Sequence, residues 1–298
     1  MVFKEYKVQK MLNNLISSDI FKCPNKICNF NECILKKHFD TVLNKEYILN
    51  FNGYASKKIY ELAIENPRPS NRKKLVNTIK EILKNENKSE FLFLDGNKDV
   101  LIISSHSVLH YRYLASIKSK RKLNDWLKIP DKNTGLIACY LHKKLNLPTL
   151  IQIYTAWLDP NFYREALLRE KLRELLKNRK IKLVLDIHGL SDDRDADFDI
   201  IDLYGLSLLP YNAIYLRNSL KLRLEKAGYN VGVNRYFNGG LMSQIQYTIV
   251  KEVSQELNTP CIELEINKKF RNIPNKIIDE KILNILVNWL ENDVLLTY

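Results

Sequence analysis

The sequence has no apolar run of eighteen residues, the length that marks a candidate membrane-spanning helix. Its first residues lack the apolar core and the small-residue cleavage site of a secretory signal. Internal repeats and low-complexity tracts are also missing, and 45% hydrophobic with 27% charged residues is typical of folded domains. We therefore expect a folded cytoplasmic protein with no membrane partner.

Cysteine is scarce, and its number is odd. Five cysteines among 298 residues argue against a disulfide framework, and Cys139 and Cys261 lie in apolar contexts typical of a core. The others form a C-x4-C-x4-C-x4-H pattern of Cys23, Cys28, Cys33 and His38. Zinc-binding cysteine pairs are typically separated by about two to four residues. The pattern predicts either a second, structural metal held in a loop or reduced, partly buried thiols.

Acidic residues are outnumbered by basic ones. The chain has 47 Lys and Arg against 34 Asp and Glu, a net charge of +13, and the excess is densest before residue 90. A basic surface attracts nucleic acid and other anions, and aromatic residues lie among these charges: Tyr6, Phe39, Tyr54 and Tyr60. The alternative is a lysine-rich compositional bias with no binding role, so the charge leaves nucleic-acid binding open.

The chain divides into two regions of different texture. Residues 1–88 are basic and mainly helical, contain the cysteine cluster, and are broken by the segment NPRPSNRKK. In residues 89–298, apolar runs of strand length alternate with amphipathic stretches. This alternation predicts an α/β domain with a mixed, mostly parallel central sheet flanked by helices.

The expected elements of the second region follow from these runs. The strands are expected at 91–95, 100–104, 149–154, 182–189, 229–234 and 261–266, and the first two flank the turn GNKD as a plausible hairpin. The helices are expected at 134–146, 161–178, 211–227, 241–257 and 275–296.

Polar, titratable side chains stand at the ends of several expected strands. The run VLIISSH ends at His106, KLVLDIHG carries His188, and YNVGVN ends at Asn234. Ligands bind beyond the carboxyl ends of the strands in such sheets. Two imidazoles with a carboxylate are a common zinc-ligand set that leaves a position for water. The alternative for each histidine alone is a hydrogen-bonded core residue.

Carboxylates near these histidines supply the remaining roles. Asp186, two residues before His188 on the same strand face, is a candidate to orient that imidazole. Asp131 is a candidate third ligand, or alternatively the N-cap of the following helix. Glu263 and Glu265 share one strand face, and either could act as a general base in amide hydrolysis.

Six segments between residues 100 and 272 occur in the order of motifs of a known family. They are VLIISSH (100–106), PDKNTGLIACYL (130–141), LDPN (158–161), LVLDIHG (183–189), NRYFNGG (234–240) and CIELEIN (261–267). As a set they resemble the N-formylglutamate amidohydrolase family, which is similar in architecture to zinc carboxypeptidases and aspartoacylase. The resemblance covers roughly the C-terminal two-thirds of the chain and implies a phosphorylase/hydrolase-like α/β fold.

The resemblance also implies roles for individual residues. The implied zinc ligands are His106, Asp131 and His188, and the implied general acid/base is Glu265. The implied pocket loop contains Asn234, Gly239 and Gly240, and the implied supporting Asp-x-Asn element is Asp159 and Asn161.

The sequence departs from the family pattern near the expected substrate. Members that hydrolyse formylglutamate tend to have an arginine shortly before the Asp-x-Asn element, but this chain reads IYTAWLDPN. Such an arginine would bind a substrate carboxylate through two hydrogen bonds, and Arg164 and Arg235 are nearby substitutes. We therefore expect formylglutamate to be a poor substrate. The acidic run at 191–202 is either a solvated loop or a pocket wall that includes Asp193, Arg194 and Asp197.

Together these features predict a zinc-dependent amidohydrolase that cleaves an N-acyl or peptide-like C–N amide bond, with one catalytic Zn²⁺ and a glutamate as base. The alternative is a nucleic-acid or partner-binding protein on a degenerate hydrolase scaffold, with the basic N-terminal region as its contact surface. A third reading is a serine hydrolase that uses Ser104 or Ser105 beside His106, although the G-x-S-x-G elbow is missing.

Overall fold

The computed structural model of the protein describes residues 90–107, 110–111, 127–128, 131–152, 158–243, 246–271 and 279–296, with the isolated positions Asn77 and Glu81. The predicted N-terminal region, with its cysteine cluster and interleaved aromatic residues, otherwise lies outside the described residues. Within the described ranges, none of the helices combines the length and the apolarity that crossing a bilayer requires.

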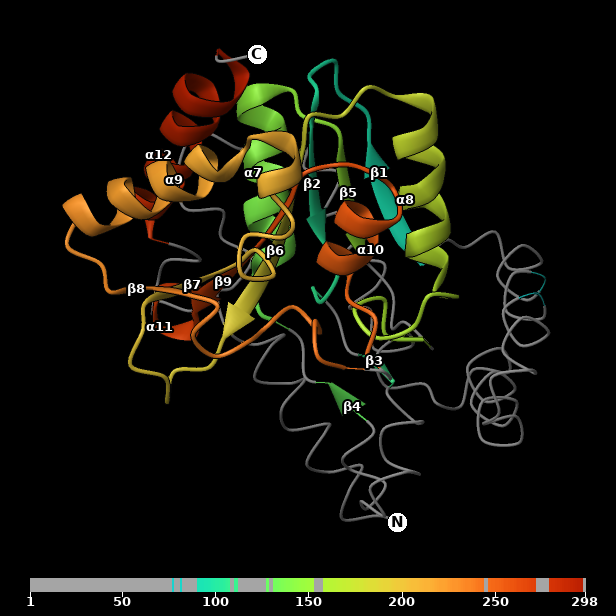
Figure 1. Ribbon diagram of the computed structural model, residues 1–298, viewed down its shortest axis with the longest axis horizontal. Coiled ribbons are helices and arrows are strands. Elements are labelled where there is room, and N and C mark those ends of the chain that lie inside the picture. The colour runs from blue at the N-terminus through green and yellow to red at the C-terminus, as the bar shows by residue number, and fades with distance from the viewer. Residues whose placement is uncertain are drawn as a thin grey trace, which may run out of the picture.

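A seven-stranded sheet forms the centre of the fold (Figure 1). Its strands, in spatial order, are β1 (Phe91–Leu94), β5 (Thr149–Gln152), β2 (Val100–Ser104), β6 (Leu183–Leu190), β9 (Cys261–Asn267), β7 (Phe198–Ile201) and β8 (Val231–Val233). Strands β5, β2, β6 and β9 are parallel, whereas β1 and the β7–β8 pair run antiparallel to them. Strands β3 (His110–Tyr111) and β4 (Leu127–Lys128) form a separate small pair. The predicted mixed, mostly parallel α/β sheet is confirmed.

Helices cover both faces of the sheet (Figure 1). One face packs against α7 (Thr134–Leu145), α9 (Ile214–Lys226) and α12 (Glu280–Trp289). The other packs against α8 (Leu167–Asn178) and α10 (Ile249–Gln255). The described residues also contain three short helical pieces: η4 (Leu209–Tyr211), α11 (Lys268–Arg271) and the π-helix η5 (Leu290–Leu295). The result is a three-layer domain with two separate hydrophobic clusters.

Side chains along the central strands alternate between the two clusters. In β2, Val100 and Ile102 belong to the cluster with α7, α9 and α12, and Leu101 and Ile103 belong to the cluster with α8 and α10. All four side chains are fully buried. A parallel strand covered on both faces therefore reads as a continuous apolar run, as the sequence VLIIS does.

The predicted hairpin between residues 91–95 and 100–104 is wrong. β1 pairs with β5 instead, and β5 lies between β1 and β2. The turn passes over the start of β5, because Asn97 N donates to Asn146 O at 3.1 Å. A Cβ on Gly96 would lie 2.4 Å from Asn146 O, so this crossing needs a glycine. Sequence proximity favoured a hairpin, but a contact with a distant segment decides the sheet order.

Strand β7 was not expected from the sequence. It lies inside the acidic run 191–202, and all of its residues are buried. Phe198 and Ile200 pack into the core, and the carboxylate of Asp199 is fully buried between β9 and β8. Helices α8 and α10 also begin later than expected, at residues 167 and 249. Of the described residues before them, 161–162, 164–165 and 241–242 form turns, and 246–248 are irregular.

Candidate metal centre

The face of the sheet toward α8 and α10 becomes polar near the carboxyl ends of β6 and β9. Asp186 and His188 continue this face in β6, and Glu263 and Glu265 continue it in β9. The parallel register pairs Asp186 with Glu263 and His188 with Glu265. Four titratable side chains are thereby placed side by side where the helical layer ends, as the strand-end pattern predicts.

His106 and Asp131 come from loops that follow β2 and precede α7. The Asp131 N–H donates to the carbonyl oxygen of His106 at 2.8 Å, which ties the two loops together. The Asp131 carbonyl oxygen accepts hydrogen bonds from the backbone and hydroxyl of Thr134, at 3.2 and 2.8 Å. The N-cap of α7 is Asn133, so the alternative of Asp131 as a helix cap is wrong. Its carboxylate instead faces the two imidazoles.

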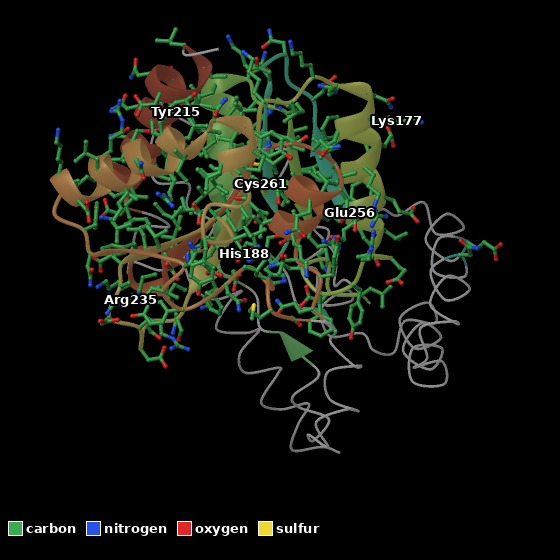
Figure 2. The ribbon with its side chains drawn as sticks, viewed as in Figure 1. Lys177, His188, Tyr215, Arg235, Glu256 and Cys261 are labelled. Carbon is green, nitrogen blue, oxygen red and sulfur yellow. The ribbon has the colours of Figure 1, made fainter. Side chains whose placement is uncertain are left out.

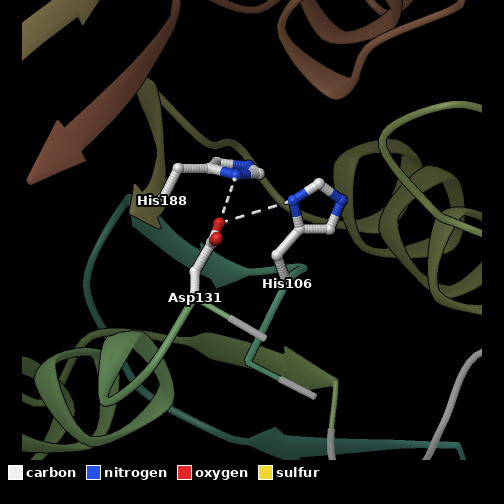
Figure 3. Close-up of side chains that lie close together, drawn as sticks. All are labelled: His106, Asp131 and His188. Atoms are coloured by element: carbon white, nitrogen blue, oxygen red, sulfur yellow. Dashed lines mark ion pairs between the residues drawn. The ribbon is translucent and has the colours of Figure 1, made fainter. Parts of the chain in front are cut away.

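His106, Asp131 and His188 meet at a single point (Figure 3). The Nδ1 atoms of His106 and His188 lie 3.5 and 3.3 Å from the same oxygen, Oδ2 of Asp131. The two rings are nearly perpendicular, with centroids 4.6 Å apart, and the three side chains are buried. One ligand atom from each lies within 4.8 Å of the others.

A carboxylate holds the far nitrogen of each imidazole. His106 Nε2 lies 2.7 Å from Asp159 Oδ1, and His188 Nε2 lies 3.0 Å from Asp186 Oδ2. Hydrogen bonds of this kind fix the orientation of a ligating histidine and leave its other nitrogen for the metal. Burial lowers the pKa of His188, but the charges of Asp186 and Glu263, with hydrogen bonds to Asp131 and Asp186, outweigh it and raise the pKa well above its ordinary value. The site therefore favours positive charge at this ring.

The donor set fits a zinc ion. Two imidazole nitrogens and one carboxylate oxygen, buried and converging, match the three protein ligands of catalytic zinc sites. Ligand atoms of Asp186, His188 and Glu263 also lie within 4.8 Å of one another. Its His188 nitrogen already lies at hydrogen-bond distance from Asp186, so we assign this group to orientation of the ring.

The serine-hydrolase reading does not fit the geometry, because the two ring nitrogens of His106, the histidine that it invokes, face the carboxylates of Asp131 and Asp159. Ser105 Oγ and Asp186 Oδ2 both lie 3.0 Å from the same nitrogen, Nε2 of His188. A catalytic triad needs the serine and the carboxylate on opposite nitrogens of the imidazole. Ser104 donates instead to Thr134 Oγ1 at 2.9 Å, and both serines are fully buried.

A cavity of about 370 Å³ opens in front of the two histidines. Its wall contains several residues predicted to bind substrate or to act on it: Asn161, Asn234, Arg235, Gly239, Gly240, Glu263 and Glu265. Asp159 lies behind His106, where it supports the ring. Asp193 and Arg194 are exposed and are not among the lining residues. Asp197 accepts from Asn230 N and pairs with Lys269 rather than facing the cavity.

The two candidate arginines differ in position. Arg235 lines the cavity and forms an ion pair with Asp195. Arg164 forms an exposed ion pair with Glu256 and is not among the residues that line the cavity. It is therefore a poor substitute for the family's arginine that binds a substrate carboxylate. Figure 2 shows Glu256 and Arg235 on different sides of His188.

The two glutamates of β9 differ in surroundings. Asn161 Nδ2 lies 3.4 Å from Glu263 Oε2, and burial raises the pKa of Glu263. Glu265 is paired in register with His188 and is 6% exposed at the cavity wall. Both remain candidates for proton transfer, with Glu265 nearer the carboxyl end of the strand.

Arg271 is a buried residue of the site that the sequence did not single out. Its guanidinium donates to the carbonyl oxygens of Ile266 at 2.7 Å, Leu190 at 3.3 Å and Lys132. These carbonyls belong to the ends of β9 and β6 and to the residue after Asp131. Burial lowers the pKa of Arg271, and the charges of Asp131 and Glu265 oppose that shift. Arg271 thus ties the Asp131 loop to the strand ends.

We expect Gly189→Ala to destabilise the fold by about 1–3 kcal/mol, the usual range for overpacking. A Cβ at this position would lie 2.2 Å from the guanidinium of Arg271, which three carbonyls hold in place. Equilibrium unfolding in urea measures the change. An unchanged midpoint would show that Arg271 can move aside and that its contacts do not fix the loop.

The sequence matches no family model and no curated relative. Solved structures do have similar folds. N-formylglutamate amidohydrolase from Ralstonia eutropha JMP134 is 13% identical, with a TM-score of 0.47 over 69% of this chain and 98% of that chain. A bacteriophage poly-gamma-glutamate hydrolase is 12% identical, with a TM-score of 0.42 over 72% and 95%. Succinylglutamate desuccinylase from Chromobacterium violaceum is 12% identical, with a TM-score of 0.41 over 68% of each chain.

The first of these structures is a protein of the family that the motifs resemble. At such identities and TM-scores, the similarity carries no conclusion about the activity of this chain. The chemistry of the site rests on the residues of this chain.

Proposed function

We propose that this protein is a zinc-dependent amidohydrolase that cleaves an N-acyl or peptide-like C–N amide bond. The convergence of His106, Asp131 and His188 beside the cavity carries the proposal. Both imidazoles are oriented by carboxylates, and a glutamate lies at the same strand edge. This is the residue set that metal-assisted hydrolysis of an amide requires.

A few residues would bind the metal and orient its ligands. His106, Asp131 and His188 would hold the metal, which when bound supplies Lewis-acid polarisation of a carbonyl and a nucleophile at neutral pH. Asp159 and Asp186 keep the two imidazoles in place through their Nε2 atoms. These two carboxylates favour the ring tautomer that leaves Nδ1 as the ligand atom.

Glu265 would carry the proton. Its carboxylate accepts a proton from the attacking water as the oxygen–carbon bond forms, and returns it to the amide nitrogen as the C–N bond breaks. Arg271 is a buried positive charge that interacts with this glutamate and with Asp131. The loop at 234–240 lines the cavity, and Asp199 fixes it by accepting from Arg235 N at 3.0 Å and Tyr236 N at 2.8 Å.

Metal dependence tests the proposal. We expect the protein stripped with a chelator to release no amine from a panel of N-formyl and N-acetyl amino acids. One equivalent of zinc should restore hydrolysis. A fluorogenic amine reagent detects the amine that is released. Magnesium is the matched control, because it prefers oxygen ligands in an octahedral arrangement. Full activity in the stripped protein, or none after zinc is restored, would contradict the proposal.

N-formylglutamate should be hydrolysed more slowly than its neutral isostere N-formylglutamine. The described part of the cavity wall offers one arginine, Arg235, and Asp195 already neutralises it. A second carboxylate on the substrate would therefore lie near the carboxylates of Glu263 and Glu265 without an arginine free to pair with it. The ratio of kcat/KM for the two compounds measures this, and a preference for the glutamate would show that Arg235 exchanges Asp195 for the substrate.

A further inference from the structure

The cavity has a polar floor and an aromatic rim. Tyr204 and Phe237 both line it, yet these residues are 61% and 42% exposed. Most large apolar residues of the described chain lie in the two core clusters instead. Two exposed rings at the mouth of a cavity that contains His106 and His188 are surface that a bound molecule would cover.

The backbone under Tyr204 is held in an unfavourable conformation. Leu203 and Tyr204 both have φ of +56°, a region that residues with a Cβ rarely occupy. The Asp202 carbonyl oxygen accepts from Gly205 N at 3.0 Å, and its Oδ1 accepts from the Asn234 amide at 2.6 Å. An ion pair between Arg217 and Asp202, at 2.8 Å, adds a third contact that holds this turn.

This conformation separates the two neighbouring side chains. Leu203 is fully buried and packs against the loop that carries Phe237, since a Cβ on Gly239 would lie 2.4 Å from Leu203 Cδ2. Tyr204 is directed outward at the cavity mouth. The strained turn therefore places the ring of Tyr204 at the cavity mouth. Because Tyr204 is exposed, packing of its ring in the core does not explain the strained conformation.

The third aromatic residue of the rim is already covered. The guanidinium groups of Arg194 and Arg235 lie 4.9 and 5.5 Å from the ring centre of Tyr236. Tyr236 thereby acts as a support for the arginines. Tyr204 and Phe237 are the exposed rings of the rim, and their faces suit an apolar or aromatic group.

We propose that the cavity selects amides with an aromatic or large apolar side chain, which Tyr204 and Phe237 contact at the rim while the scissile bond lies at the polar floor. This inference rests on the proposed amidohydrolase function for the position of the bond. The proposed substrate class differs from the glutamate compounds after which the three similar structures are named.

Hydrolysis of a matched pair tests the substrate class. In the zinc-loaded protein, kcat/KM for N-formylphenylalanine should exceed that for N-formylalanine by about tenfold or more, as expected for burial of one aromatic group. Tyr204→Gly and Phe237→Ala should each reduce this ratio several-fold, mainly through KM. Tyr204→Gly also relieves the positive φ, so its thermal midpoint should not fall, which separates loss of the ring from misfolding.

Tyr215→Ala is the matched control. Tyr215 is a tyrosine of α9 that is 36% exposed and is not among the cavity-lining residues, and Figure 2 shows it well away from His188. This variant should keep the wild-type ratio. A ratio near one in the wild type, or an unchanged ratio in both rim variants, would overturn the proposal.

Direct binding keeps the two proposals distinguishable. Calorimetry with N-acetylphenylalaninamide and N-acetylalaninamide should show tighter binding of the aromatic amide, and Tyr204→Gly should remove most of the difference. Aromatic-selective binding without hydrolysis would refute the amidohydrolase proposal and leave the rim assignment standing. Hydrolysis with no aromatic preference in rate or binding would refute the rim assignment alone.

Discussion

His188→Ala is expected to abolish tight zinc binding. The side chain is 2% exposed, and its Nδ1 atom lies 3.3 Å from Asp131 Oδ2, so its loss leaves two of three protein ligands. Loss of an orienting partner alone reduces metal affinity by about 10–100-fold, and loss of a ligand should exceed this. Competition with a chromophoric chelator measures the affinity.

His142→Ala is the control for this experiment. His142 lies in the last turn of α7, where its Nδ1 contacts Leu147 O at 2.8 Å, on a different part of the domain from the cavity. This variant should bind zinc as the wild type does, and circular dichroism should show a native fold in both variants. Undiminished affinity in His188→Ala would remove this residue from the ligand set.

Glu265→Gln should keep the metal and lose hydrolysis by about 10²–10⁴-fold, the range for loss of a general acid/base. The amide matches the carboxylate in size, so the fold and the ligands His106 and His188 should be unaffected. The effect should fall on kcat, because the proton moves only as bonds form and break.

Glu263→Gln is the matched comparison. Glu263 lies two residues earlier on the same strand face, and Asn161 already contacts its carboxylate. We expect a smaller loss of kcat in this variant. Equal turnover in Glu265→Gln and the wild type, with a large loss in Glu263→Gln, would reverse the assignment of the base.

The sequence predicts the strand-end part of the site well, because its signal is local. In D-I-H, two-residue spacing puts Asp186 and His188 on one face of β6, and the same spacing in CIELEIN aligns Glu263 and Glu265. The runs VLIIS and TLIQ are buried on both faces, so their composition marks them as strands. These features need no knowledge of distant contacts.

Other parts of the site depend on contacts between distant segments, and no local pattern predicts them. The position of β1 beside β5 is set by the crossing at Gly96. Arg271 reads as one more charge in NKKFR, yet its contacts reach residues 132 and 190. Asp199 is hidden within an acidic run that suggests solvent exposure, and its carboxylate holds the cavity loop. Similarly, no local sequence pattern predicts the positive φ of Tyr204.

The metal content of the purified protein, determined by mass spectrometry beside the His106→Ala/His188→Ala variant, tests the central claim most directly. The structure predicts about one equivalent of zinc in the wild type, or after its reconstitution with zinc, and loss of that equivalent in the double variant. Zinc that survives the double variant would assign the metal elsewhere, with the cluster of Cys23, Cys28 and Cys33 as the next place to examine. A wild type that takes up no zinc after reconstitution would contradict the metallohydrolase account.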